Sequence, residues 1–225
     1  MCADRARVAL SWSGGKDAAW ALHRLRATPG IEVVALVTTV VPAFGRVAMH
    51  GVRAELVRAQ AWAAGVPQLE VPLPWPSSND EYERRMMVAL GMLQREQGVS
   101  HVAFGDLFLE DVRAYRERML AGSGLTPLFP LWLEPTGALA VTMLASGLEA
   151  RIVCLDPTRV GRDLAGRRLD AALLAGLPAE VDPCGERGEF HTFVTAGPML
   201  RHAVPVALGE IVEREGFVYA DLVAV

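Results

Sequence analysis

The residues best suited to chemistry in the first half of the chain stand in one turn, Ser11-Trp12-Ser13-Gly14-Gly15-Lys16-Asp17, between an apolar run and a helical pattern. Two adjacent glycines allow a tight turn and a close approach to a ligand, and the helix that follows supplies unpaired N–H groups at its positive end. Lys16 adds a mobile positive charge, and an acidic residue beside phosphates favours Mg²⁺ bound at Asp17. The turn therefore predicts a nucleotide phosphate loop formed by Ser11, Ser13, Gly14, Gly15, Lys16 and Asp17.

This turn differs from the two commonest nucleotide motifs. Leu10 and Asp17 stand where the ordinary P-loop has glycine and a hydroxyl residue, and the chain contains no G-x-G-x-x-G. The alternative is a glycine-rich strand-to-helix turn with a structural role only. The combination of Ser13, Lys16 and Asp17 favours nucleotide binding over that alternative.

A second group of chemically active residues stands in Cys184-Gly185-Glu186-Arg187-Gly188-Glu189-Phe190-His191-Thr192. If a strand begins near Glu189, residues 189 and 191 lie on one face, so that Glu189 and His191 point together into a cleft. The alternative is a solvated polar turn.

The elements that must position these residues alternate between strands and helices in the first half, which predicts a parallel sheet covered by helices. We expect strands at 7–11, 31–38, 68–71 and 101–105, and helices at 16–27, 52–64 and 79–97. Open parallel sheets bind ligands beyond the carboxyl ends of their strands, so Ser13, Thr38 and Asp106 are expected on one rim.

The pattern changes near residue 126, where Pro127, Pro130 and Pro135 interrupt the chain. Beyond them we expect helices at 136–146 and 168–175, and strands at 151–155, 190–195, 204–213 and 217–225. The prediction is an α/β protein with a nucleotide-binding domain at 1–125 and a smaller α+β subdomain for the substrate at 126–225.

Composition narrows the class of protein. With 225 residues, of which 52% are hydrophobic, the chain can bury one sizeable core. The formal net charge of −4 argues against broad binding to nucleic acid, and no apolar run approaches the about 18 residues that cross a bilayer. Three distant cysteines, Cys2, Cys154 and Cys184, predict reduced thiols. We expect a soluble, cytoplasmic protein without a membrane partner.

Ser13-Gly14-Gly15-Lys16-Asp17 resembles the signature of the PP-loop ATPases, or N-type ATP pyrophosphatases, which reads Ser-Gly-Gly-x-Asp-Ser. The resemblance implies the adenine nucleotide alpha hydrolase-like (HUP) fold and ATP as a ligand. One position differs, since Ala18 replaces the final serine and removes a hydroxyl that could contact a phosphate.

Nearly the whole chain is similar to the diphthine–ammonia ligase family of PP-loop proteins. The further matches, in order, are His50-Gly51-Val52-Arg53, Gly105-Asp106, Pro130-Leu131-Trp132 and Gly185-Glu186-x-Gly188-Glu189-Phe190. The resemblance implies ATP-dependent amidation of a carboxylate by ammonia or an amine, with release of AMP and pyrophosphate and with Mg²⁺ as cofactor. The acceptor implied by the resemblance is a small molecule or a modified protein side chain.

The resemblance also implies roles for individual residues. Glu186, Glu189 and His191 would hold the acceptor or ammonia, and His50 and Arg53 would bind a phosphate or the substrate carboxylate. Gly105 and Asp106 would lie at the nucleotide, with Asp106 holding Mg²⁺ or ammonia. The alternatives are a solvated helix start for His50 and Arg53 and a turn or cap for Asp106. The family pattern has glycine and an acidic residue where this chain has Arg187 and His191, which favours a different acceptor.

Two other functions stay open. A PP-loop enzyme that modifies tRNA would bind RNA in a salt-sensitive way, and a nucleotide-binding protein without turnover would bind ATP but not hydrolyse it. The apolar end Leu222-Val223-Ala224-Val225 fits either a homodimer contact or a buried last strand.

Overall fold

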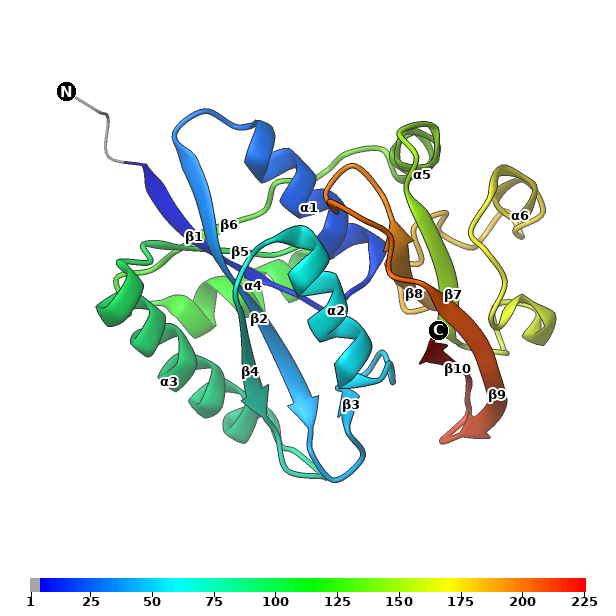
Figure 1. The fold of residues 1–225 in the computed structure, drawn as a ribbon, viewed down its shortest axis with the longest axis horizontal. Helices are drawn as coiled ribbons and strands as arrows, with labels where there is room; N and C mark the ends of the chain where they lie inside the picture. The colour runs from blue at the N-terminus through cyan, green and yellow to red at the C-terminus, as the bar shows by residue number, and fades with distance from the viewer. Residues whose placement is uncertain (1–4) are drawn as a thin grey trace.

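The computed structural model describes residues 5–225, which form two sheets (Figure 1). The first sheet holds five parallel strands in the order β4-β2-β1-β5-β6 and a short strand, β3, antiparallel to the end of β2. Their bounds are β1 (Ala6–Ser11), β2 (Ile31–Val41), β3 (Arg46–Val47), β4 (Gln68–Pro72), β5 (His101–Ala103) and β6 (Thr126–Leu128). The predicted parallel α/β sheet is confirmed.

Helices cover both faces of this sheet because its strands are apolar on both sides. Val8 and Leu10 pack in one core with α1 (Lys16–Ala27) and α2 (Ala54–Ala64), whereas Ala9 packs in the other core with α3 (Asn79–Gln97) and α4 (Glu110–Leu120). In Figure 1, α1 and α2 lie between the first sheet and the second, and α3 lies on the opposite side. This three-layer arrangement leaves the C-terminal ends of β1 and β5 open to a ligand.

The second sheet is antiparallel, in the order β8-β7-β10-β9. It contains β7 (Glu149–Leu155), β8 (Phe190–Ala196), β9 (Val206–Arg214) and β10 (Phe217–Ala224), and is accompanied by α5 (Thr136–Ala145), the 3-10 helix η1 (Arg162–Leu164) and α6 (Ala171–Ala175). The predicted C-terminal α+β unit is confirmed. The domain boundary at residue 125 stays a prediction, and β6 carries the first sheet on to Leu128.

Side chains from both sheets share one apolar core. Leu10 and Leu36 of the first sheet belong to the same buried cluster as Ile152, Phe193 and Leu222 of the second. The last strand therefore buries Leu222 within the chain itself, while Val225 beyond it is 84% exposed.

Some predicted bounds were wrong. The second helix begins at Ala54 rather than at residue 52, β5 ends at Ala103 rather than at 105, and α6 spans only Ala171–Ala175. Helix α4 was not predicted, because it buries only Met119 and Leu120 and has no regular apolar stripe.

Cys154 and Cys184 are buried free thiols, and Cys2 lies outside the described residues. Within residues 5–225, every helix is too short or too polar to cross a bilayer.

Candidate functional site

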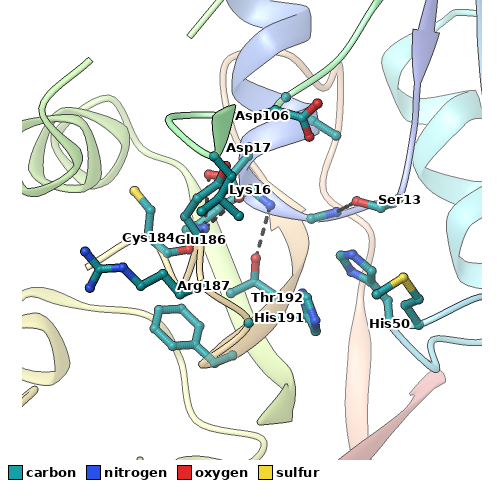
Figure 2. A pocket seen from close by; sticks show the side chains of 18 of the residues that line it. Ser13, Lys16, Asp17, His50, Asp106, Cys184, Glu186, Arg187, His191 and Thr192 are labelled. Atoms are coloured by element: carbon teal, nitrogen blue, oxygen red, sulfur yellow. Dashed lines mark hydrogen bonds and ion pairs between the residues drawn. The ribbon is translucent and has the colours of Figure 1, made fainter. Parts of the chain in front are cut away.

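A cavity of about 630 Å³ lies where β1 and β5 end and β8 begins. In the strand order, β1 connects to β2 on one side and has β5 on the other, which is the switch point where parallel sheets bind ligands. Figure 2 shows side chains from both halves of the chain converging there. Of the predicted site residues, those that line the cavity are Ser11, Ser13, Gly15, Lys16, Asp17, His50, Gly105, Asp106, Glu186 and His191.

The glycine turn is shaped by close packing at Gly14. This residue has a φ of +82°, and a Cβ atom there would lie 2.7 Å from Oε1 of Gln60. The carbonyl of Gly14 accepts hydrogen bonds from Nε2 of Gln60 and from the backbone N–H of Val194, each at 3.0 Å. Gly14 does not line the cavity, and its role in the structure is to fix the turn against α2 and β8.

Lys16 is the only lysine of the chain, since the other 21 of its 22 Lys and Arg residues are arginines. Its side chain is 2% exposed, and Nζ donates to Oδ2 of Asp17 at 2.7 Å and to the carbonyl of Cys184. Burial acts to lower the pKa of Lys16, but the charge and hydrogen bond of Asp17 together with the charges of Cys184 and Glu186 outweigh burial and raise it. The expectation of a mobile charge was therefore wrong, because these partners hold the ammonium in place.

The start of α1 is also less open than expected. The backbone N–H of Lys16 donates to Oγ1 of Thr192 at 3.1 Å, and that of Gly15 lies 3.3 Å from Oγ of Ser13. Thr192 was not predicted as a functional residue, because 176 positions separate it from Lys16. Its hydroxyl accepts a hydrogen bond from the Lys16 N–H group, which we expected to be unpaired.

Glu186 lies in the cavity beside the carboxylates of the first half. Its Oε1 accepts a hydrogen bond from the N–H of Leu107 at 2.7 Å. Burial raises the pKa of Glu186 to about 7, and the nearby charges of Asp17 and Asp106 act in the same direction. This carboxyl can take up or release a proton near neutral pH.

Glu189 does not point into the cavity with His191. It is 1% exposed, and its carboxylate accepts from the N–H of Asp182 at 3.1 Å and of Arg187 at 2.9 Å. Because β8 begins only at Phe190, the strand alternation on which we relied does not reach residue 189. The solvated-turn alternative was also wrong, since this buried carboxylate organises its own loop.

His50 and His191 face each other at one end of the cavity, with ring centroids 4.6 Å apart (Figure 2). Burial lowers the pKa of His191 to about 4, with Lys16 acting in the same direction, and burial together with His191 lowers that of His50. Both rings are neutral at pH 7. Within the described residues, Nδ1 of His50 is buried without a hydrogen-bond partner.

Asp106 follows β5 and faces Arg116 of α4, with Oδ2 3.5 Å from Nε. Within the described part of the chain, neither of these buried atoms has a hydrogen-bond partner. Arg116 lines the cavity and was missed because α4 was missed. Gly105 lies against the loop, and a Cβ there would be 2.9 Å from the backbone N of Ala18.

Two further predicted residues, Thr38 and Arg53, lie outside the cavity. Thr38 is buried, donates to the carbonyl of Trp12 and accepts from Gln68, so its hydroxyl ties β2 to its neighbours. Arg53 binds Asp221 of β10 at 2.7 Å and does not line the cavity.

The carboxylates of the cavity decide whether Mg²⁺ fits this site. Residues 5–225 contain no group of three His, Cys, Asp or Glu side chains placed to hold a metal ion. Both oxygens of Asp17 contact Nζ of Lys16, at 3.0 and 2.7 Å, whereas Oδ2 of Asp106 is unsatisfied. Mg²⁺ commonly takes only one or two carboxylates beside phosphate and water, so this donor set fits a metal that arrives with a nucleotide.

Comparison with known proteins covers both halves of the chain. The family model of the diphthamide synthase N-terminal domain matches residues 6–127, and that of the diphthamide synthase C-terminal domain matches residues 136–222. A diphthine–ammonia ligase of Schizosaccharomyces pombe is 27% identical over 143 residues, which are 61% of this chain and 23% of that protein. A diphthine–ammonia ligase of Danio rerio is 29% identical over 153 residues, 65% of this chain and 59% of that protein. The chain thus spans less than two thirds of the length of either relative.

Proposed function

Since the chain belongs to the diphthamide synthase family, as the sequence motifs predicted, we propose that it is an ATP-dependent ligase that joins ammonia to a carboxylate. ATP is converted to AMP and pyrophosphate. The names of the two curated relatives support the class of reaction, while His191 and Arg187 favour an acceptor other than diphthine.

The observation that carries the proposal is the meeting of the glycine turn, Lys16 and Glu186 in one cavity at the switch point of the sheet. A carboxylate is a poor electrophile, whereas its acyl-adenylate has AMP as a leaving group. The acceptor oxygen attacks the α-phosphorus, and the bond from that phosphorus to the bridging oxygen breaks to release pyrophosphate. The ammonia nitrogen then attacks the acyl carbon, and the C–O bond to AMP breaks.

In this proposal Ser13, Gly15 and Asp17 border the phosphates, and Lys16 balances the charge that develops on pyrophosphate. A buried ammonium held by fixed partners is effective at this, because little reorganisation is needed when charge develops. Mg²⁺ would be held by Asp106 and Asp17 together with phosphate oxygens, and when bound it supplies further positive charge.

Glu186 is the proposed proton acceptor of the amidation step. Attack by ammonia places a positive charge on nitrogen, and one N–H proton must leave before the amide forms. With a pKa of about 7, Glu186 is ionised often enough at neutral pH to take that proton. Ser11 and Gly105 shape the cavity wall.

The test is product analysis together with calorimetric titration of ATP and Mg²⁺. With ammonium and a suitable carboxylate, AMP and pyrophosphate should appear in equal amounts, and formation of ADP would refute the proposal. Lys16→Met keeps the length of the side chain and should weaken ATP binding at least tenfold. Glu210→Gln, at an exposed position of β9 outside the cavity, is the control and should leave ATP affinity within about twofold.

A further inference from the structure

A second cavity of about 410 Å³ adjoins the first. The two share the side chains of Met49, His191 and Phe217, so these residues form a common wall. The second cavity lies between the β2–β3 turn and residues of β9 and β10. Its other lining residues include Phe44, Arg46, Trp75, Arg214, Tyr219 and Asp221.

Aromatic side chains at the mouth of this cavity are left open to solvent. Phe44 is 53% exposed and Trp75 is 55% exposed, and their rings meet edge to face at a centroid distance of 5.7 Å. Exposed apolar side chains that gather in a concave site are typical of ligand-binding surfaces. A planar ring placed against this pair would bury apolar area that the chain alone leaves exposed.

The charged side chains that line this cavity balance, since Arg46 and Arg214 stand against Glu215 and Asp221. The carboxylate of Asp221 binds Arg46 at 2.8 Å and Arg53 at 2.7 Å. Burial acts to raise the pKa of Asp221, but the hydrogen bonds from the two guanidinium groups lower it. The negative charge of Asp221 is thus already neutralised by guanidinium groups, and the lining as a whole carries no net charge.

The wall between the cavities carries an uncharged imidazole. His191 of this wall faces His50 of the first cavity, and Nδ1 of His50 has no partner within the described residues. Met49 beside them has a φ of 63°, rare for a residue with a side chain, and is 78% exposed. Strained backbone of this kind concentrates at functional sites.

We propose that the second cavity binds the acceptor and that the acceptor is a small aromatic carboxylic acid. The inference rests on the function proposed above, which requires a carboxylate, while the exposed pair of Phe44 and Trp75 supplies the preference for a ring. The ring lies against Phe44 and Trp75, and the carboxylate reaches past His191 toward the α-phosphate of ATP in the first cavity.

The test measures binding of three probes without ATP, by saturation-transfer NMR and calorimetry. Indole-3-acetate has a ring and a carboxylate, hexanoate has a carboxylate but no ring, and tryptamine has the same ring and an ammonium group. We expect indole-3-acetate to bind at least tenfold more tightly than either of the others. Trp75→Ala should weaken this binding about tenfold, whereas Trp62→Ala, which removes a tryptophan that is 79% exposed and lines neither cavity, should not change it.

The outcomes separate this inference from the proposed function. The acceptor site would be overturned if the three probes bound equally, if tryptamine bound best or if indole-3-acetate did not bind. Equal effects of Trp75→Ala and Trp62→Ala would also overturn it. Should Trp75→Ala fail to fold by circular dichroism, Phe44→Ala takes its place with the same expectation. ATP titration of the same samples tests the first cavity alone, so intact ATP binding with no acid binding rejects only the acceptor site.

Discussion

Replacing Glu186 by glutamine should stabilise the protein, and more so at high pH. Burial raises the pKa of this carboxyl from 4.5 to about 7, so the folded state holds the proton more tightly than the unfolded state. The unfolded state loses this proton first as the pH rises. The contribution of Glu186 to the free energy of unfolding therefore falls between pH 4.5 and pH 7 and then stays level. A neutral amide at this position avoids that loss.

The magnitude follows from the same shift. At about 1.4 kcal/mol for each tenfold change in proton affinity, the full penalty above pH 7 is about 3 kcal/mol. Because Glu186 is partly open to the cavity, solvent screening reduces this to about 1–2 kcal/mol. The amide oxygen of glutamine can still accept the hydrogen bond from the N–H of Leu107.

Urea unfolding of the wild type and Glu186→Gln at pH 5 and pH 8.5 measures the effect. The variant should gain about 1–2 kcal/mol over the wild type at pH 8.5 and much less at pH 5. Glu210→Gln on the exposed surface of β9 corrects for the loss of one negative charge from a chain of net charge −4. An equal effect at both pH values, or a less stable variant at pH 8.5, would show that folding does not raise the pKa of this carboxyl.

Three further variants test the site. Gly105→Ala should cost about 1–3 kcal/mol in urea unfolding and weaken ATP binding at least tenfold, because the new Cβ meets the proposed phosphate loop. Its control, Gly137→Ala in α5, adds a Cβ in open space and should stabilise the protein by about 0.5–1 kcal/mol. Equal effects of the two variants would contradict this. Thr192→Val removes the acceptor of the Lys16 N–H and should cost about 1–2 kcal/mol, and no change in urea unfolding would show that the bond is dispensable. Arg53→Gln should cost less than about 1 kcal/mol and leave ATP affinity within twofold by calorimetry, since its ion pair is partly exposed and outside the cavity; a large loss of ATP binding would restore it as a ligand.

The sequence predicted the elements whose signals are local. Helix α3 was found from its apolar spacing and begins at Asn79 as predicted, with Ser78 as its cap and with Gly98 in the left-handed conformation at its end. The glycine turn could be recognised as a candidate phosphate loop because its glycines and charges are adjacent. Helix α4 was not predicted because its interior positions are mostly charged.

The contacts that complete the site could not be predicted, because they join distant parts of the chain. Thr192 binds the N–H at the start of α1, 176 positions away in the sequence, and Asp221 binds Arg53, 168 positions away. Glu189 was misplaced for a local reason, since the loop before β8 turns its carboxylate toward its own backbone. Residue types alone do not distinguish a carboxylate that serves a ligand from one that serves a loop.

The presence of a single lysine has a practical consequence for spectroscopy. Protein produced with isotopically labelled lysine carries one labelled side chain, and that side chain lines the candidate site. Its ε-carbon and ε-nitrogen resonances need no assignment by mutagenesis. They would report the ionisation of the ammonium group, its release from Asp17 and the arrival of each substrate as changes in one signal.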